Sequence, residues 1–309
     1  MSAGWVAAGV RGRGLVRRCL GSGACEQLGS QTSLADAVAL LSHSPYGRDV
    51  RAEMGLSSAQ HAVSATVLWH LRVLAGWGPP LGATQLRLVA GSFEITNVVG
   101  HLHALAGHDV DPAFVLGALA TAWPRVAQAP TPAEVRRSLA TSPWGDPGSE
   151  DPAAVGLVMQ FGWARRIADG APEAAGWATA YAALVAARTI AAEAVPVLAG
   201  TGANDSKRLL GPDWDTARSV GDLGRRLPRR AAWVLAGIED PDELWRAEAR
   251  WWERVEYEAA SVSRSSWSGA GSALGSCFLL VVDGWRVRAA LEMAARGGGS
   301  LREVTGAVA

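Results

Sequence analysis

The sequence predicts an all-α fold, and three observations carry that prediction. Apolar residues recur at helical spacing through most of the 309 residues, and no segment shows the alternation typical of a half-buried strand. Capping residues and Pro or Gly stops mark the ends of these segments. A short phrase also occurs twice in matching surroundings, as Ser44-Pro45-Tyr46-Gly47 and as Ser142-Pro143-Trp144-Gly145.

Each copy of the phrase follows the same predicted helix. Ser33-x-x-Asp36 precedes the first copy and Thr131-x-x-Glu134 the second, both in the pattern of a capping box. Each copy therefore predicts a cap, a short amphipathic helix and a turn with Pro, an aromatic residue and Gly. We interpret this as an internal duplication, which favours a modular scaffold over a single catalytic pocket. The alternative is a favourable helix terminator that arose twice.

The other elements follow from periodicity and stops. The pattern over 5–19 predicts an amphipathic helix whose apolar stripe is flanked by arginines. Asp111-Pro112 and Asp240-Pro241 each predict an N-cap followed by Pro at the first helical position. The further predicted helices span 59–74, 93–105, 113–123, 153–167, 174–194, 241–260 and 273–296. Between them we predict a linker over 143–152, a polar loop over 200–211 and a break over 261–271.

Composition limits the class of protein. The chain is long enough for two or three structural units. Its formal net charge of zero argues against a general nucleic-acid binder. No apolar run reaches the roughly 18–20 residues of a membrane span. Arginines interrupt the region where the apolar part of a secretion signal would lie, and three cysteines fit a reducing compartment. We therefore expect a soluble, cytoplasmic protein.

No residue pattern predicts a catalytic, cofactor-binding or metal site. His101 and His103 lie two apart on a helix, so they point to different sides and cannot share a metal ion. Cys19 and Cys25 lack the CxxC spacing. The acidic run over 239–243 resembles at first the metal-binding aspartates of helical isoprenoid synthases, but a helix start explains the same residues.

Aromatic and arginine side chains are the candidates for a protein–protein interface. The chain has fourteen tryptophans, and two adjacent ones on a helix must present one ring outward. Exposed aromatic rings beside arginines are typical interface anchors. The candidates are Arg11, Arg13, Arg17, Arg18, Trp251 and Trp252. A solvated helix face also explains the four arginines.

Several segments together resemble the V-type ATPase C/AC39 family, also called the V-zero d subunit family, as a divergent member of bacterial type. The similar segments are, in the family's order, Ala7-x-x-Val10-Arg11-x-Arg13-x-Leu15 with Leu20, 34–47 with the first Ser-Pro-Tyr-Gly phrase, Phe93-Glu94-x-x-Asn97-Val98, 280–296 and 301–304. In the closing segment, Asp283 stands where the family has Glu, and Arg286 stands where it has Asn.

The resemblance implies three similar helical lobes arranged as a funnel-like socket within one unit, 1–309. The approximate lobes are 1–105, 106–200 and 201–309, with a third copy of the capped helix beginning at Asp240-Pro241. It also implies a non-catalytic central-stalk subunit without a cofactor. Such a subunit couples the shaft of the ATP-hydrolysing head to the membrane rotor ring during ion transport. Its partners would hold it at the cytoplasmic face of the membrane.

Two other functions stay open. A helical enzyme of the isoprenoid-synthase type would bind magnesium and a prenyl diphosphate. A helical-repeat adaptor unrelated to rotary ATPases would bind neither. Neighbouring genes distinguish the adaptor from the rotary subunit, because a rotary subunit should lie beside genes for the ring, the shaft and the catalytic head.

Overall fold

The computed structural model describes residues 3–78, 80–193, 198, 200–265 and 270–300, and within these the secondary structure is helical, with no β-strand. The predicted all-α fold is confirmed. The chain divides into two compact units, residues 1–86 with 252–309, and residues 87–251. Two helices, α5 (Pro80–Leu105) and α13 (Leu244–Ser265), pass from one unit to the other. The three predicted lobes stay a prediction.

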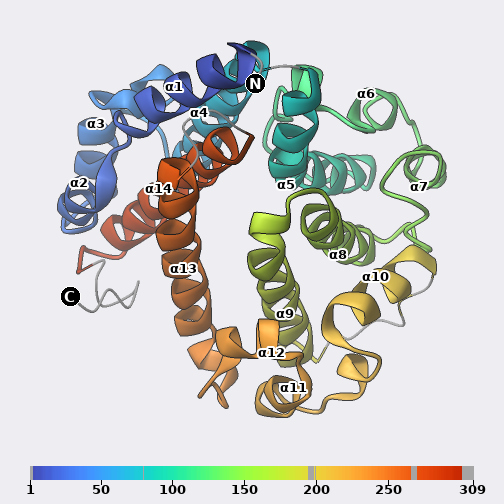
Figure 1. The fold of residues 1–309 in the computed structure, drawn as a ribbon. Helices are drawn as coiled ribbons and strands as arrows, with labels where there is room; N and C mark the ends of the chain where they lie inside the picture. Colours follow the sequence, from blue (N-terminus) through green and yellow to red (C-terminus); the bar gives the residue numbers. More distant parts are fainter. Residues whose placement is uncertain (1–2, 79, 194–197, 199, 266–269, 301–309) are drawn as a thin grey trace. The chain divides into compact units, whose positions relative to one another are not determined.

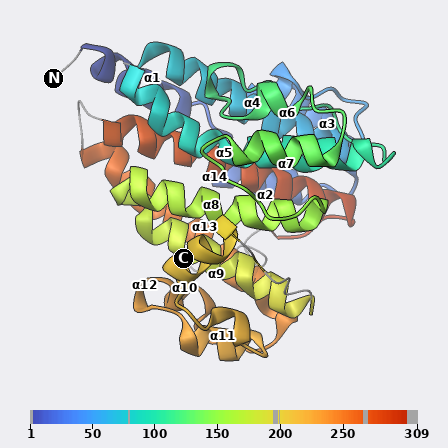
Figure 2. The same ribbon diagram turned by 90° about the vertical axis from the view of Figure 1, so that its right-hand side faces the viewer.

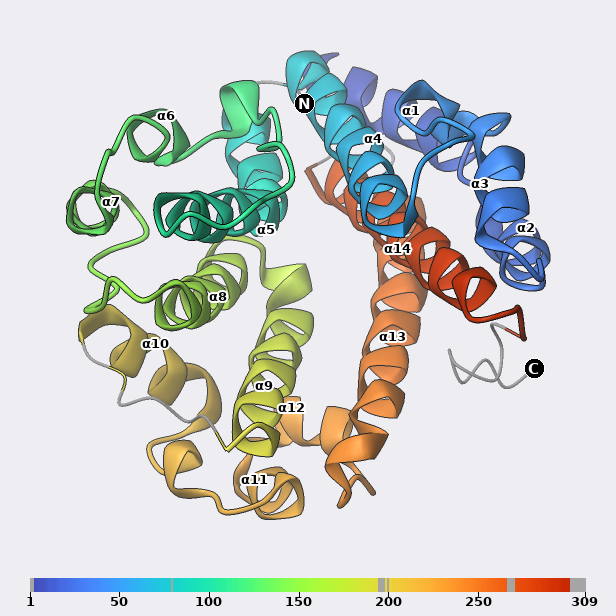
Figure 3. The same ribbon diagram turned by 180° about the vertical axis from the view of Figure 1, so that it is seen from behind.

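The first unit is organised around α14 (Ala270–Ala295). Figures 1 and 3 show α14 beside α1 (Ala3–Val16), α2 (Gly21–Gly29) and α4 (Leu56–Trp77), and α3 (Leu34–Ser42) also packs on it. The approach of α1 is close because small residues meet there. A Cβ atom at Gly12 would lie 2.8 Å from the Ser276 side chain. The predicted N-terminal amphipathic helix is confirmed, with Ala8 and Leu15 buried.

The second unit has α8 (Pro152–Gly170) and α9 (Ala175–Ala191) side by side. Against them pack α10 (Gly200–Leu210) and, on α9, α11 (Val220–Arg226) and α12 (Arg229–Ala232), as Figure 2 shows. A further pair is formed by α6 (Trp123–Val126) and α7 (Pro132–Ala140). The 3-10 turns in the two units are η1 (Pro45–Arg48), η2 (Gly117–Leu119), η3 (Pro172–Ala174), η4 (Trp214–Thr216), η5 (Trp233–Leu235) and η6 (Pro241–Glu243).

Most predicted helices are confirmed, although their ends differ. The helix predicted over 93–105 ends correctly but begins earlier, at Pro80. Asp240 is an N-cap as predicted, since its side chain accepts a hydrogen bond from the Asp242 N–H at 2.9 Å. The predicted break over 261–271 is wrong at its start, because α13 continues to Ser265. The end of the helix predicted over 174–194 lies outside the described residues, because 194–197 are not described. The same holds for 266–269, within the predicted break.

The helix predicted over 113–123 is wrong. Between α5 and α6 the chain forms only the single 3-10 turn η2. The Asn97 side chain accepts from the Phe114 N–H at 2.7 Å and donates to the Phe114 carbonyl at 2.9 Å. Because this side chain takes both backbone groups of Phe114, neither is available to a helix. A tertiary contact therefore overrides the local Asp-Pro signal.

The polar loop predicted over 200–211 is also wrong, because these residues form α10. Its buried side contains Asp205 and Ser206 as well as Leu209 and Leu210. Asp205 is held by an ion pair with Arg165 of α8, at 2.6 Å between Oδ1 and Nε. The prediction failed because the partner that allows Asp205 to be buried lies on another helix and is not visible in the local sequence.

The linker predicted over 143–152 is not a boundary between the two units. The segment joins α7 to α8 inside the second unit, and Trp144 is buried there. Its Pro and Gly residues shape a packed turn. Among the described helices, none combines the length and apolarity that crossing a membrane requires.

Replacing Gly47 by Ala should destabilise the first unit, because the added methyl would lie 2.0 Å from the Ser42 carbonyl oxygen. We expect a loss of about 1–3 kcal/mol of unfolding free energy, measured by urea denaturation. Gly23→Ala is the matched control, since nothing lies within 4 Å of its Cβ position in α2. The control should be neutral or stabilise by up to about 1 kcal/mol. Equal effects of the two changes would contradict the close approach.

Candidate functional site

The repeated phrase adopts the same hydrogen-bonded geometry in both copies. Ser44 Oγ donates to the Leu41 carbonyl at 2.6 Å and accepts from the Tyr46 N–H at 3.1 Å. In the second copy, Ser142 makes the corresponding two bonds at 2.7 Å and 3.1 Å. One hydroxyl thus joins the end of the helix to the turn that follows it. The Ser-Pro-aromatic-Gly phrase therefore forms the same turn, with the same two serine hydrogen bonds, in both places.

Both copies also begin as predicted. Ser33 Oγ accepts from the Asp36 N–H at 3.2 Å, and Thr131 Oγ1 accepts from the Glu134 N–H at 3.3 Å. In the first copy the carboxylate of the capping pair accepts from the Ser33 hydroxyl at 2.7 Å. The predicted cap, short helix and turn are therefore confirmed in each copy.

The aromatic residue of each copy points at a buried carboxylate. Tyr46 Oη donates to Asp283 Oδ2 at 2.8 Å, and Trp144 Nε1 donates to Glu94 Oε2 at 3.2 Å. Asp283 is 4% exposed and Glu94 is 1% exposed. A carboxylate at this depth is tolerated only when hydrogen-bond donors surround it. We call the carboxylate, the aromatic donor and the backbone N–H groups described next a carboxylate clamp.

In the first clamp, Asp283 reaches from α14 to the start of α2. Its carboxylate accepts from the Leu20 N–H at 3.0 Å and from the Gly21 N–H at 2.9 Å. These groups have no partner within the helix, and the helix dipole favours negative charge there. The clamp therefore fastens α2, the turn at Tyr46 and α14 to one another.

In the second clamp, Glu94 reaches from α5 to the start of α6. Its carboxylate accepts from the backbone N–H groups of Thr121, Ala122 and Trp123 at 2.6–3.1 Å. Together with the Trp144 indole, four N–H groups surround the two oxygens. The same three kinds of group are thus assembled from a different set of helices.

The first clamp has buried thiols beside it. Burial raises the pKa of Cys25 to about 12 and raises the pKa of Cys19 above its usual range, and the charge of Asp283 raises both further. Burial and then Asp283 also raise the pKa of Tyr46. Thiols held in the protonated form are poor nucleophiles and poor metal ligands. The thiols therefore add no negative charge beside the Asp283 carboxylate.

A third N-cap with the same spacing lies at the start of α11. Ser219 Oγ accepts from the Asp222 N–H at 3.1 Å. Leu227 is buried at the same distance in sequence from the cap as Leu41 and Leu139, although α11 already ends at Arg226. Asp240, the predicted start of a third copy, caps only η6 before the long helix α13. Ser219 is therefore the closer structural counterpart.

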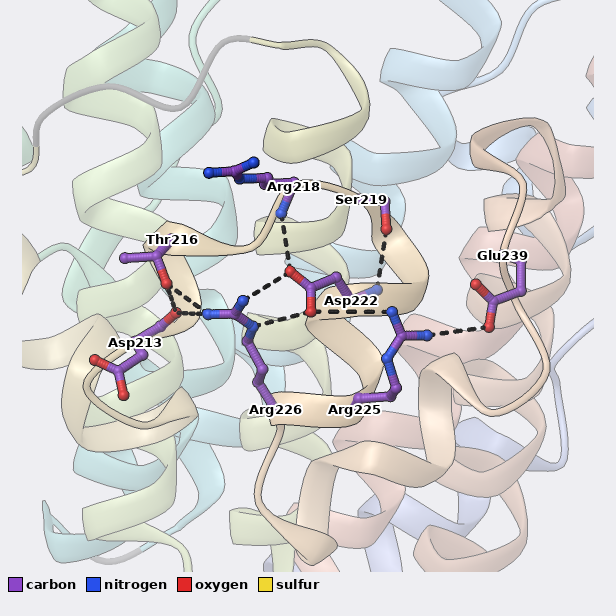
Figure 4. Close-up of polar contacts among 8 residues, drawn as sticks. All are labelled: Asp213, Thr216, Arg218, Ser219, Asp222, Arg225, Arg226 and Glu239. Carbon is purple, nitrogen blue, oxygen red and sulfur yellow. Dashed lines mark hydrogen bonds and ion pairs between the residues drawn. The ribbon is translucent and has the colours of Figure 1, made fainter.

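Arginines hold the third cap from outside (Figure 4). The Asp222 carboxylate accepts from the Arg218 N–H and from Arg226 Nε, both at 3.1 Å, and Arg225 lies between Asp222 and Glu239. The hydrogen bond from Arg226 is the main reason why the pKa of Asp222 lies below its usual range. This exposed network differs from the two buried clamps.

The predicted arginine candidates lie on or just after α1 in the first unit. Arg11, Arg17 and Arg18 are exposed, and the Arg11 guanidinium lies 5.8 Å from the centre of the Trp77 ring. Arg13 is half-buried and donates to Ser272 Oγ at 2.9 Å. Three of the four arginines are therefore available at the surface of this unit.

The predicted tryptophan candidates are less available. Trp251 is 5% exposed, and its Nε1 donates to the Trp177 carbonyl at 2.8 Å, so the ring packs inside the second unit. Trp251 is therefore wrong as a surface anchor. Trp252 is half-buried and stacks on Trp285 with 5.2 Å between ring centres. The two adjacent rings do point to different sides of α13, as predicted, but Trp285 of α14 partly covers Trp252.

The histidines do not form a metal site. His101 Nε2 lies 2.9 Å from the Ala129 carbonyl oxygen, and His103 packs edge-on against His108. In the described part of the chain, no group of three or more His, Cys, Asp or Glu side chains is arranged to hold a metal ion.

Sequence reasoning missed the role of both clamp carboxylates. Glu94 lies among other polar residues, whereas a usable signal was present for Asp283, which is the only charged residue in the apolar run 277–285. Such an acid is costly to bury unless it is fully hydrogen-bonded, so it marks a fixed partner elsewhere in the chain. No protein-family model matches this sequence, and no curated protein matches it.

Tyr46→Phe should weaken the first clamp, because it removes one donor from a buried carboxylate. We expect a loss of about 1.5–3 kcal/mol of unfolding free energy in urea denaturation. Combining it with Asp283→Asn should reveal a coupling of about 0.5–3 kcal/mol. Tyr257→Phe is the control, since Tyr257 is exposed, and it should be neutral. Strict additivity of the two clamp changes would contradict the contact.

The buried thiols should resist alkylation in the native protein. With pKa values near 12 for Cys25 and Cys277, only about one thiol in ten thousand is ionised at pH 8. Iodoacetamide followed by mass spectrometry should modify both only after denaturant is added.

The same pKa shifts set the direction of a pH effect on stability. The native pKa exceeds the unfolded value of 9.0, so the thiols' contribution is complete below pH 9 and is lost as the pH rises from 9 toward 12. Urea denaturation at pH 8 and at pH 11 measures this loss. Rapid alkylation of Cys25 and Cys277 in the native protein at pH 8 would contradict the raised pKa values from which it follows.

Proposed function

We propose that the protein is a non-catalytic central-stalk subunit of a rotary V-type ATPase. It would couple the shaft of the ATP-hydrolysing head to the membrane rotor ring during ion transport. The family resemblance of the sequence motivates this proposal. One structural observation supports it most, namely that the same capped helix, turn and carboxylate clamp occur in each of the two compact units.

Repeated lobes are what the V-zero d fold would require. The clamp at Asp283 lies in one unit and the clamp at Glu94 in the other, and the cap at Ser219 is a candidate for a third copy. The Phe93-Glu94-x-x-Asn97 element, which carries part of the resemblance, supplies both Glu94 and Asn97 to the chain that follows it. The matching residues therefore have a definite structural role.

Torque transmission would need lobes that keep their shape under load. Hydrogen bonds from N–H and O–H groups to a carboxylate are stronger than neutral ones, and a fully satisfied buried network rigidifies its surroundings. Each clamp joins three chain segments through one carboxylate. This stiffness suits a mechanical linker.

Two basic surfaces are candidates for contact with acidic partner surfaces. The first is α1, with Arg11, Arg17 and Arg18. The second is formed by the exposed Arg218, Arg229 and Arg230 on and around α11 and α12. Their neighbours Arg208, Arg225 and Arg226 already pair with acids and add no excess charge. Exposed charges of one sign guide association and select partners of opposite sign. The subunit would then reach the membrane only through its partners.

The proposal is tested by co-purification from the source cells. A tagged chain should isolate shaft and rotor-ring subunits when the rotary complex is assembled, and Arg11→Glu combined with Arg18→Glu should weaken at least one of these contacts. An assembled complex that contains no copy of the chain would overturn the proposal. Binding of magnesium and a prenyl diphosphate would favour a helical isoprenoid-synthase enzyme. Recovery with unrelated partners only would favour an adaptor.

A further inference from the structure

We propose that the second unit contains a phosphate-binding site formed by Arg87 of α5, Arg166 of α8 and the Thr121 hydroxyl. The site is independent of the proposed function. It is inferred from two buried hydrogen-bond donors without partners among the described residues, Arg87 Nε and Thr121 Oγ1, and from the half-buried guanidinium of Arg166. All three lie near one carboxylate, Glu94.

Arg166 contributes a half-buried positive charge. Its guanidinium carbon lies 4.6 Å from the centre of the Trp144 ring, and the residue is half-buried. Among the residues that the structure describes, its guanidinium makes no hydrogen bond and no close ion pair, and the charge of Glu94 acts on it from farther away. Burial lowers the pKa of Arg166, and the nearby positive charges of Arg165 and Arg87 lower it further, against the opposing effect of Glu94.

Arg87 and Thr121 supply the other donors. Arg87 Nη2 donates to the Ala118 carbonyl at 3.0 Å, but its Nε is buried and has no partner among the described residues. Thr121 Oγ1 is likewise buried without a partner within the described ranges, although its N–H is bonded to Glu94. Buried polar atoms are nearly always satisfied, so these two point to a group that completes them.

The three side chains converge because each lies next to the second clamp. Thr121 and Trp144 both donate to Glu94, Arg166 covers the Trp144 ring, and Arg87 holds the chain just before Thr121. Glu94 cannot serve as the missing acceptor, because four N–H groups already occupy its oxygens.

The charges and shapes of these groups fit a phosphate. Two guanidinium groups outweigh the one buried carboxylate, so the cluster has an excess positive charge. Arg165 does not contribute to that excess, because it pairs with Asp205 at 2.6 Å and with Asp169 at 3.0 Å. Guanidinium forks and a hydroxyl that donate from different elements suit a tetrahedral oxyanion, whose oxygens point in several directions.

The test is titration of the full chain with inorganic phosphate by isothermal calorimetry at constant ionic strength. Wild-type protein should bind one phosphate, and Arg87→Gln and Arg166→Gln should each weaken binding at least tenfold. Arg125→Gln is the matched control, since it removes the same charge from an exposed arginine close to Thr121 in the chain, and it should change the affinity less than twofold. Circular dichroism confirms that each variant is folded.

Thr121→Val keeps the test valid if an arginine variant fails to fold. Removing an unpartnered hydroxyl should not lower the melting temperature without phosphate, but it should reduce the rise in melting temperature that phosphate produces. No phosphate binding to the wild-type chain would overturn the proposal. So would binding that all three variants retain, because the ion would then occupy another place.

Discussion

The fold depends on a carboxylate that is buried at the start of a helix and bonded to an aromatic side chain. Burying the charge alone would be strongly unfavourable, so the arrangement exists only where every donor is in place. In the first unit, Asp283 accepts hydrogen bonds from the backbone at the start of α2 and from the Tyr46 hydroxyl. In the second unit, Glu94 accepts them from the backbone at the start of α6 and from the Trp144 indole. Loss of one donor therefore affects all the segments that meet there.

The third cap is held in another way. No aromatic residue of the Ser-Pro-aromatic-Gly kind follows it, and the chain after α12 is fixed instead by Arg250. Its Nη1 donates to the carbonyls of Trp233, Val234 and Ala236 at 2.9–3.2 Å. A cation at backbone carbonyls here replaces an anion at backbone N–H groups. The two solutions follow the same rule, since each supplies the charge that the exposed backbone groups attract.

Local signals predicted much of the fold, and the failures have physical causes. Helical periodicity and the caps at Ser33, Thr131 and Asp240 were enough to place most helices, because those interactions span only a few residues. The helix predicted over 113–123 does not form, because Asn97 of α5 bonds to the backbone of Phe114. The clamp carboxylates were missed for a similar reason. Their partners are 27 or more residues away in the sequence, and an acid within a helix does not show where its donors lie.

The two clamps differ in when they can form during synthesis. Glu94 finds its donors 27 to 50 residues further along the chain, all within the continuous segment 87–251. Asp283 instead binds the N–H of Leu20 across 263 residues. The second unit can therefore complete its core while the ribosome is still adding the remainder. The first unit must keep its N-terminal helices unfinished until α14 emerges, so the part made first is the part completed last.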